Sequence, residues 1–197
     1  QMAALTVDQV TALTTAQAGV LTSVQTPGLK STQVGSLESV DLQQIKTSAF
    51  AVLGTGVMAN LDSTQVGSLT TDQVKALTTL QASALTNVQT VGITTDQTGA
   101  LQVGALSKLT TSAFEAINTA VTSGLSSTQI GALTTAQVKA LTTAQASTLT
   151  SVQTVGLTTS QAVGLETADL SQFTTSAFEA IAPGVLACLL YTSPSPR

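Results

Sequence analysis

Few side chains in this chain of 197 residues could carry out chemistry. It contains no His and no Trp, one Cys (Cys188) and one Tyr, with 10 Asp and Glu in all. The absence of His excludes a His-dependent catalytic triad and a His metal ligand. The sequence offers Cys188 no base that would activate it, so we interpret it as an inert thiol. The residues therefore predict no catalytic site and no enzyme.

Two pairs of acidic residues have a spacing that could bind a cation. Glu38 stands three residues before Asp41, and Glu166 stands three residues before Asp169 in an equivalent repeat. The repeat between them has Gln102 and Ala105 at these places. We therefore favour solvated helix starts and predict no metal site. No phosphate-binding or EF-hand spacing is present either, so no cofactor is expected.

Charge and hydropathy limit the partners. The net charge of −4 comes from scattered residues, so no basic stripe indicates nucleic acid. Thr or Gln interrupts every apolar stretch before the roughly 18 residues of a membrane span. Hydrophobic residues make up 43% of the chain, which argues against disorder. The expected partners are neighbouring repeats and a second copy of the chain, with any surface ligand unknown.

An eight-residue repeat must position all these residues. From Leu5, every eighth residue up to Ile181 is Leu, Ile or Phe, which gives 23 octads without insertion or deletion. The fifth octad residue is Gln in 14 of the 23, and the second and third are mostly Thr or Ser. One octad cannot bury its own Leu, so neighbouring octads must stack into a continuous core.

A longer, 64-residue period overlies the octad and corresponds to a block of eight octads. Three octads in each block lack the Gln, and each such group contains Thr-Ser-Ala-Phe, which places Phe50, Phe114 and Phe178 at equivalent sites. We interpret the bulky sixth residues of these octads as a wider core layer. Each block of eight octads is predicted to form one superhelical turn or one module.

The octad predicts a very short helix. Eight residues at about 100° each would make the leucines spiral around one continuous helix. Thr followed three residues later by Gln is instead a capping box, and the flanking Leu and Val can form a hydrophobic staple. The structural residues that we single out for this reason are Leu69, Thr70, Gln73 and Val74, and Leu133, Thr134, Gln137 and Val138.

We therefore predict an all-α solenoid with one short helix per octad. The alternative is a β-solenoid, because an even repeat keeps every Leu on one face of a strand. That face would also carry the mostly polar third and fifth residues, so we favour helices.

The octads LSSTQIGA, LTTAQVKA and LTTAQAST (residues 125–148) resemble units of long bacterial surface or adhesin-like proteins that iterate L-[ST]-x-x-Q. The resemblance implies a secreted or surface-displayed structural segment: a stalk, spacer, adhesin or fibre. The alternative is a solenoid whose regular Thr and Gln face binds ice or glycan. Residues 1–187 are expected to be a solenoid fragment of a longer protein, and residues 188–197 an aberrant, non-native tail.

Overall fold

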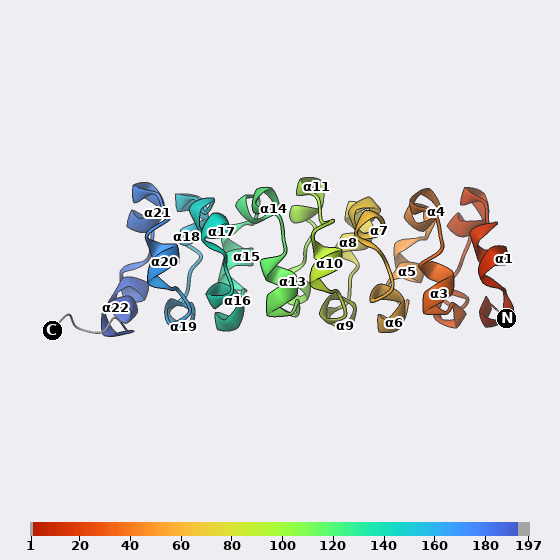
Figure 1. Cartoon of the computed structure of the whole chain (residues 1–197), viewed down its shortest axis with the longest axis horizontal. Coiled ribbons are helices and arrows are strands. Elements are labelled where there is room, and N and C mark those ends of the chain that lie inside the picture. The colour runs from red at the N-terminus through yellow and green to blue at the C-terminus, as the bar shows by residue number, and fades with distance from the viewer. Residues whose placement is uncertain (1, 193–197) are drawn as a thin grey trace.

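The computed structural model describes residues 2–192, without the side chains of residues 190–192, and forms a rod of short helices (Figure 1). The helix of each octad packs against the helix three octads later, so three octads make one coil. No strand occurs among residues 2–192. The prediction of an all-α solenoid is confirmed, and the β-solenoid alternative is wrong.

The coils stack their helices in three columns. The first column contains α1 (Val7–Thr11), α3 (Ser31–Val34), α6 (Thr55–Met58), α9 (Thr79–Ser83), α12 (Val103–Leu106), α15 (Ser127–Gly131), α18 (Ser151–Thr154) and α21 (Thr175–Glu179). The second contains α2 (Thr15–Gly19), α4 (Ser39–Gln44), α7 (Ser63–Ser68), α10 (Asn87–Thr90), α13 (Thr111–Glu115), α16 (Thr135–Lys139), α19 (Thr159–Ala162) and α22 (Pro183–Thr192). The third contains η1 (Met2–Ala4), η2 (Thr26–Gly28), α5 (Thr47–Phe50), α8 (Thr71–Lys75), α11 (Thr95–Thr98), α14 (Thr119–Ser123), α17 (Thr143–Ser147) and α20 (Thr167–Leu170).

The segment expected to be an aberrant tail lies only partly within this rod. Cys188 and Leu189 belong to α22, which runs on to Thr192, and both pack against the end of the core. The rest of the expected tail, residues 193–197, lies outside the described residues.

Each helix begins where the octad supplies a cap. In α16, the Thr134 side chain accepts a hydrogen bond from the Gln137 amide, and the Gln137 side chain accepts one from the Thr134 amide. The helix ends one turn later at Ala140, the small eighth residue. Helices of four to six residues are too short to be stable alone, so stacking between coils must hold them.

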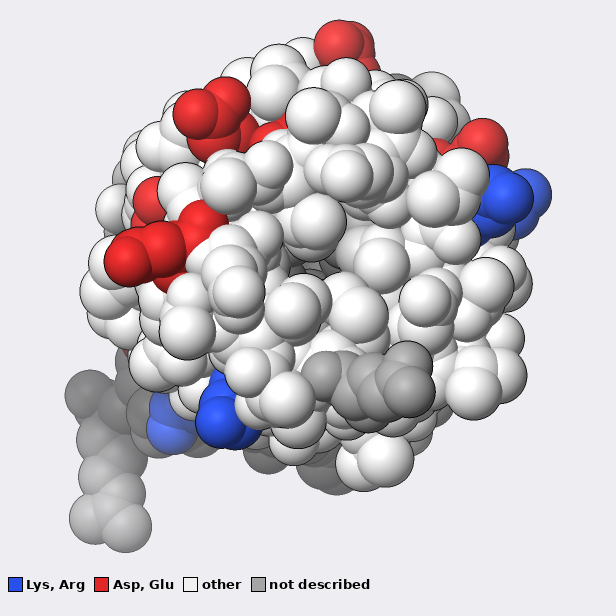
Figure 2. Space-filling view, turned by 90° about the vertical axis from the view of Figure 1, so that its right-hand side faces the viewer, with Lys and Arg blue, Asp and Glu red and all other residues white. Residues whose placement is uncertain are grey.

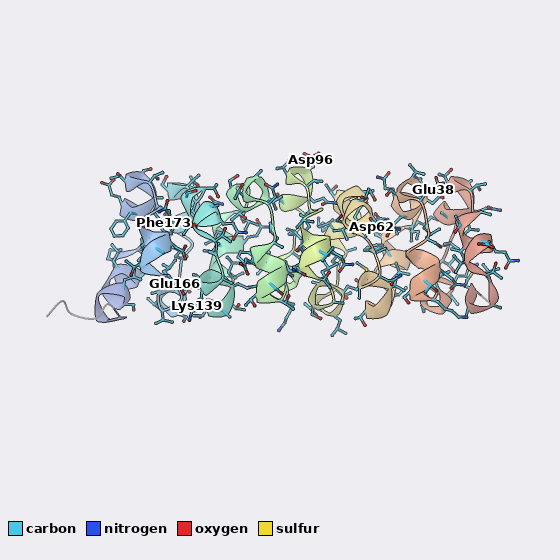
Figure 3. All side chains as sticks on the ribbon, viewed as in Figure 1. Glu38, Asp62, Asp96, Lys139, Glu166 and Phe173 are labelled. Carbon is cyan, nitrogen blue, oxygen red and sulfur yellow. The ribbon has the colours of Figure 1, made fainter. Side chains whose placement is uncertain are left out.

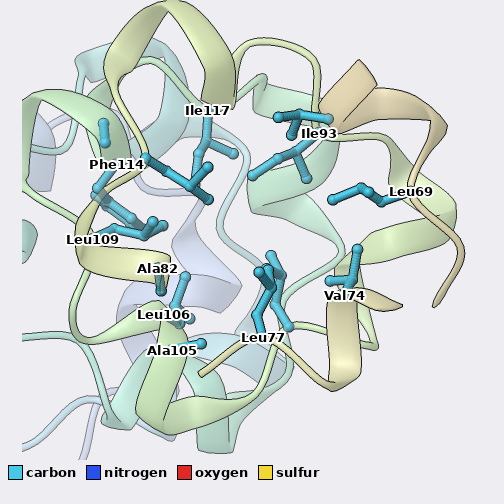
Figure 4. Close-up of a cluster of buried hydrophobic side chains, with 14 of the residues drawn as sticks. Leu69, Val74, Leu77, Ala82, Ile93, Ala105, Leu106, Leu109, Phe114 and Ile117 are labelled. Carbon is cyan, nitrogen blue, oxygen red and sulfur yellow. The ribbon is translucent and has the colours of Figure 1, made fainter. Parts of the chain in front are cut away.

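The first and sixth residues of the octad line one continuous core along the rod. Figure 4 shows the part of this core around Leu77 and Phe114. Every first residue from Leu21 to Leu165 is buried. Sixth residues such as Val74 and Phe114 are buried as well. Leu5, Leu13 and Phe173, which lie in the outermost coils, are only partly buried.

The longer period does not match a turn of this solenoid. Because one coil has three octads, a block of eight octads makes two and two-thirds coils, and equivalent residues therefore fall on different columns. Phe50 lies on α5, Phe114 on α13 and Phe178 on α21, one in each column. The interpretation of one block as one superhelical turn is wrong, because packing fixes a turn of three octads.

Viewed along the rod from the end where the N-terminus lies, acidic and basic side chains lie around the rim of the cross-section, and uncharged atoms fill its centre (Figure 2). Among the helices of residues 2–192, none combines the length and the apolar character required for a membrane span.

Candidate functional site

The fifth residue of the octad bonds one coil to the coil before it. In α8, the Gln73 Oε1 atom accepts a hydrogen bond from the Thr70 amide at 3.0 Å, which completes the cap. The Nε2 atom of the same side chain donates to the carbonyl oxygens of Leu42 and Ile45, both at 2.8 Å. These carbonyls belong to the preceding coil, 31 and 28 residues earlier in the chain. The Gln side chain thus both starts its own helix and cross-links two coils.

The same pair of inter-coil bonds recurs along the rod. Eleven Gln side chains donate to the carbonyl 28 residues earlier at 2.6–3.0 Å and to the carbonyl 31 residues earlier at 2.6–3.5 Å: Gln33, Gln65, Gln73, Gln81, Gln89, Gln97, Gln129, Gln137, Gln145, Gln153 and Gln161. All eleven are buried. We call this set the glutamine ladder.

Burial explains why the ladder stabilises the rod. A buried amide that lacks partners costs about 1–3 kcal/mol, whereas a satisfied hydrogen bond contributes about 1 kcal/mol. In the first coil, Gln9, Gln17 and Gln25 still accept the cap bond, but their side chains are exposed. These three residues separate the capping role of Gln from its inter-coil role.

Most residues that the octad pattern singled out lie in the core, at helix N-caps or in the glutamine ladder. Leu69, Val74, Leu133 and Val138 are buried in the core, and Thr70 and Thr134 are the N-caps of α8 and α16. Gln73 and Gln137 belong to the glutamine ladder. The capping partners were predictable from local spacing, but the bonds between coils were not.

The three Phe residues do not share one environment. Phe50 and Phe114 are fully buried, whereas Phe178 is 43% exposed. The expected wider core layer therefore fails at Phe178. The physical reason is that, within residues 2–192, α21 packs only on α18 in its column, with no later helix to cover the Phe178 ring.

A second cross-link follows the 64-residue period. Thr26, Thr90 and Thr154 occupy the sixth octad position, and each is fully buried. Their hydroxyls donate to the carbonyl oxygens of Ala49, Ala113 and Ala177, each at 2.7 Å. These Ala residues replace the Gln in the Thr-Ser-Ala-Phe octads. Sequence reasoning missed this pairing, although Thr at the same place in three successive blocks was a visible signal.

Comparison with known proteins supports a repeat protein. Residues 45–79 match the sequence model of a family described as the ALTTAQ repeat. No match to a curated protein was found. The chain is thus similar to ALTTAQ repeats over about four octads, and this supports a repeat protein.

The hexapeptide of that family description has a structural meaning in this chain. Ala-Leu-Thr-Thr-Ala-Gln occurs at residues 12–17, 132–137 and 140–145. At residues 132–137, Ala132 ends α15, Leu133 enters the core, Thr134 caps α16 and Gln137 reaches the preceding coil. The ALTTAQ unit therefore contains the residues that end one helix, begin the next and donate the hydrogen bonds of the glutamine ladder.

Glycines allow helices to pack closely at two equivalent places. A Cβ atom on Gly92 would overlap the Ser63 carbonyl oxygen, and one on Gly156 would overlap the Ser127 carbonyl oxygen. Both glycines have negative φ, so close packing, and not a left-handed turn, requires Gly there. Sequence reasoning did not identify these residues.

The acid pairs lie at the starts of α4 and α20, with one buried and one exposed member each. Asp41 and Asp169 are 4% and 3% exposed, whereas Glu38 and Glu166 are exposed at the N-cap positions (Figure 3). Burial, and then the charge of Glu166, raise the pKa of the Asp169 carboxyl above its ordinary value. The prediction that both acids are solvated is wrong for the Asp residues. Within residues 2–192, no group of three or more His, Cys, Asp or Glu residues could hold a metal by itself.

The third column carries a line of Thr side chains. The third octad residue is Thr in six successive helices of this column: Thr47, Thr71, Thr95, Thr119, Thr143 and Thr167. All are exposed or partly exposed. The second-position Thr residues, such as Thr70 and Thr134, are helix N-caps. The third-position Thr residues of this column therefore form a regular line of hydroxyl groups on the surface.

Proposed function

We propose that this chain is the non-catalytic structural repeat region of a bacterial surface protein, where it acts as a stalk, spacer, adhesin or fibre-forming segment. The glutamine ladder is the observation that carries the proposal. It joins successive coils by the same buried hydrogen bonds, so each added coil of three octads lengthens the rod without a new type of contact.

A rod of this kind suits an extended role outside the cell. The side chains of the glutamine ladder are buried between coils, and the sparse charges are spread around the rim (Figure 2). The resemblance of the octads to bacterial surface repeats and the similarity to ALTTAQ repeats support a repeated scaffold of this type.

The proposal is tested by measuring how far the rod extends from the cell envelope. The chain is displayed on a bacterial cell with a tag after residue 187, and versions with three or six added octads are compared by immunogold labelling. We expect the distance between tag and cell envelope to increase by the same amount for each coil. A distance that does not change with the number of coils would contradict the spacer role.

The line of Thr side chains on the third column favours a second candidate, in which the rod binds a regular surface such as ice or glycan. The 64-residue period opposes it, because features of that period move to a new column in each block. Ice recrystallisation and glycan-array binding of the intact chain are compared with a variant that carries Thr95→Lys and Thr143→Lys. Binding that both substitutions abolish would favour this candidate.

A further inference from the structure

The two ends of the rod carry the two halves of one inter-coil contact. Gln9, Gln73 and Gln137 are equivalent residues of the 64-residue period. Gln73 and Gln137 each donate to the carbonyls 31 and 28 residues earlier. The next carbonyl pair of this series belongs to Leu170 and Phe173, and no Gln among residues 2–192 donates to it. Gln9, the remaining donor, is exposed at the opposite end.

The neighbouring octad repeats this match. Gln17 is equivalent to Gln81 and Gln145, which also donate to the carbonyls 31 and 28 residues earlier. The next carbonyl pair of this second series belongs to Phe178 and Ile181. Gln17 is exposed, and its Nε2 atom meets no carbonyl within residues 2–192. Two Gln donors at one end of the rod thus correspond to two carbonyl pairs at the other.

Apolar side chains at the two ends are uncovered in the same register. In the middle of the rod, α8 packs on α5 and α16 on α13, and Phe50 and Phe114 are fully buried. Phe178 on α21 is 43% exposed, and the helix equivalent to α8 and α16 is α1. On the octad of α1, Leu5 is only partly buried, whereas the equivalent Leu69 on the octad of α8 is buried. Each end therefore lacks the neighbour that the other end can provide.

The columns of the rod allow these matches to occur together. Three 64-residue blocks make 192 residues, or 24 octads, which is eight coils of three octads. Sequence equivalence and column therefore return together after three blocks. A second copy whose first coil follows the last coil of the first copy sets η1 on α20, α1 on α21 and α2 on α22, each in its own column. In this register, both exposed Gln donors meet the open carbonyl pairs.

We propose that this chain associates head to tail with a second copy, whose first coil stacks on the last coil and extends the glutamine ladder across the junction. The inference rests on the proposed structural role and names a partner for it. The junction continues the interface that already joins the coils, so it needs no new type of contact. Because it joins unlike faces and does not close, it yields open chains of rods and no closed dimer.

Charge opposes this contact only weakly. On the face at the N-terminal end, charged side chains lie around the rim and uncharged atoms fill the centre (Figure 2). Exposed acids lie on both of the helices that would stack, Asp8 on α1 and Glu179 on α21. Salt screens the repulsion between exposed charges, so added NaCl should strengthen the association.

Sedimentation velocity of the intact chain measures the association. We expect the average mass to rise continuously above the 19.8 kDa of one chain as the protein concentration increases, without a plateau at the dimer. A mass that stays at that of one chain up to about 1 mM protein would overturn the proposal. It would leave the spacer role intact, because the immunogold experiment tests that role separately.

Variants that block one end each distinguish this junction from other contacts. Gln9→Glu with Gln17→Glu keeps the capping oxygens but turns carboxylates toward the carbonyls of the other copy, which blocks the first coil. Phe178→Asp places a charge on the last coil at a position that is already 43% exposed. Each variant alone should stay monomeric, whereas a mixture of the two should form one-to-one dimers and nothing larger. Association of either variant by itself would mean that like ends or sides of the rods meet, and it would overturn the proposal.

Leu80→Asp provides the matched control, because Leu80 is 70% exposed on α9 in the middle of the rod. The association of this variant should equal that of the parent. Loss of association would show that rods pack side by side and would contradict end-to-end stacking. Circular dichroism of every variant checks that it keeps the helix content of the parent.

Discussion

At the scale of single residues, the Gln side chain is the connecting element of this protein. Its Oε1 atom satisfies the start of its own helix, and its Nε2 atom satisfies carbonyls at the end of a helix in the preceding coil. Both ends of a short helix need such partners, because the terminal backbone groups have none within the helix. One Gln side chain thus provides hydrogen-bond partners for the start of one helix and the end of another.

Replacing Gln73 by Ala tests this double role. The variant loses one cap bond and two buried inter-coil bonds, and we expect a loss of about 3 kcal/mol in the free energy of unfolding. Gln9→Ala is the matched control, because Gln9 forms the cap bond but is exposed, and its loss should be about 1 kcal/mol. Urea unfolding followed by circular dichroism measures both. Equal losses would show that only capping matters.

The buried Asp169 predicts a pH dependence of stability. Its pKa is raised in the folded chain, so folding favours the protonated form. Its contribution to stability is therefore fully present below the ordinary Asp pKa and is lost as pH rises through the raised folded pKa. The parent should gain stability relative to an Asp169→Asn variant as pH falls from neutral into the acidic range. A difference that is constant with pH would show that the carboxyl titrates normally.

A companion variant, Glu166→Gln, identifies the cause of that shift. Removal of the neighbouring charge should lower the pKa of Asp169 in the folded chain and move the change in stability to lower pH. The rise in this pKa that burial causes should remain.

At the scale of the helix, stacking decides which residues fit. Helices of four to six residues gain their stability from neighbours in the same column, so the space between stacked helices limits the side chains there. Where α10 packs on α7, the backbones approach so closely that only Gly is accommodated at residue 92.

Gly92→Ala should therefore destabilise the rod by about 1–3 kcal/mol, because the added methyl group overlaps the Ser63 carbonyl and one helix must move. Gly99→Ala is the control. Gly99 ends α11 in ordinary helical geometry with no atom near its missing Cβ, and the change should stabilise by about 0.4–1 kcal/mol. Thermal melting of the two variants should shift in opposite directions, and a shift in the same direction would contradict the packing argument.

At the scale of the whole molecule, the helices of residues 2–192 stack on helices of the adjacent coils. Stability in such a rod is close to a sum of coil terms and interfaces between coils, so the ends should open before the middle. The first coil supports this expectation, since Leu5 and Leu13 are only partly buried and the Gln17 side chain is exposed.

Amide hydrogen exchange measures this gradient. We expect protection to be highest in the central coils, for example in α10 and α13, and lower in α1 and α2 of the first coil. Uniform protection along the rod would mean that it unfolds as one cooperative unit.

The sequence by itself determined the local structure. The eight-residue phase, the Thr-to-Gln spacing and the Leu and Val that flank it predicted one short helix per octad, with Thr70 and Thr134 as caps. These features depend on contacts within about five residues, and local spacing in the chain records them directly.

Only the tertiary structure decided how many octads make a coil. Three octads per turn follow from how the short helices stack, and no residue within one octad encodes that number. The stacking of coils places the carbonyl partners of Gln73 at distances of 31 and 28 residues along the chain, and the partner of Thr90 at 23 residues. It also leaves no space for a side chain at residue 92. It also buried Asp41 and Asp169, which the local pattern assigned to solvent, because the stacking of a second coil on a helix start cannot be read from that helix alone.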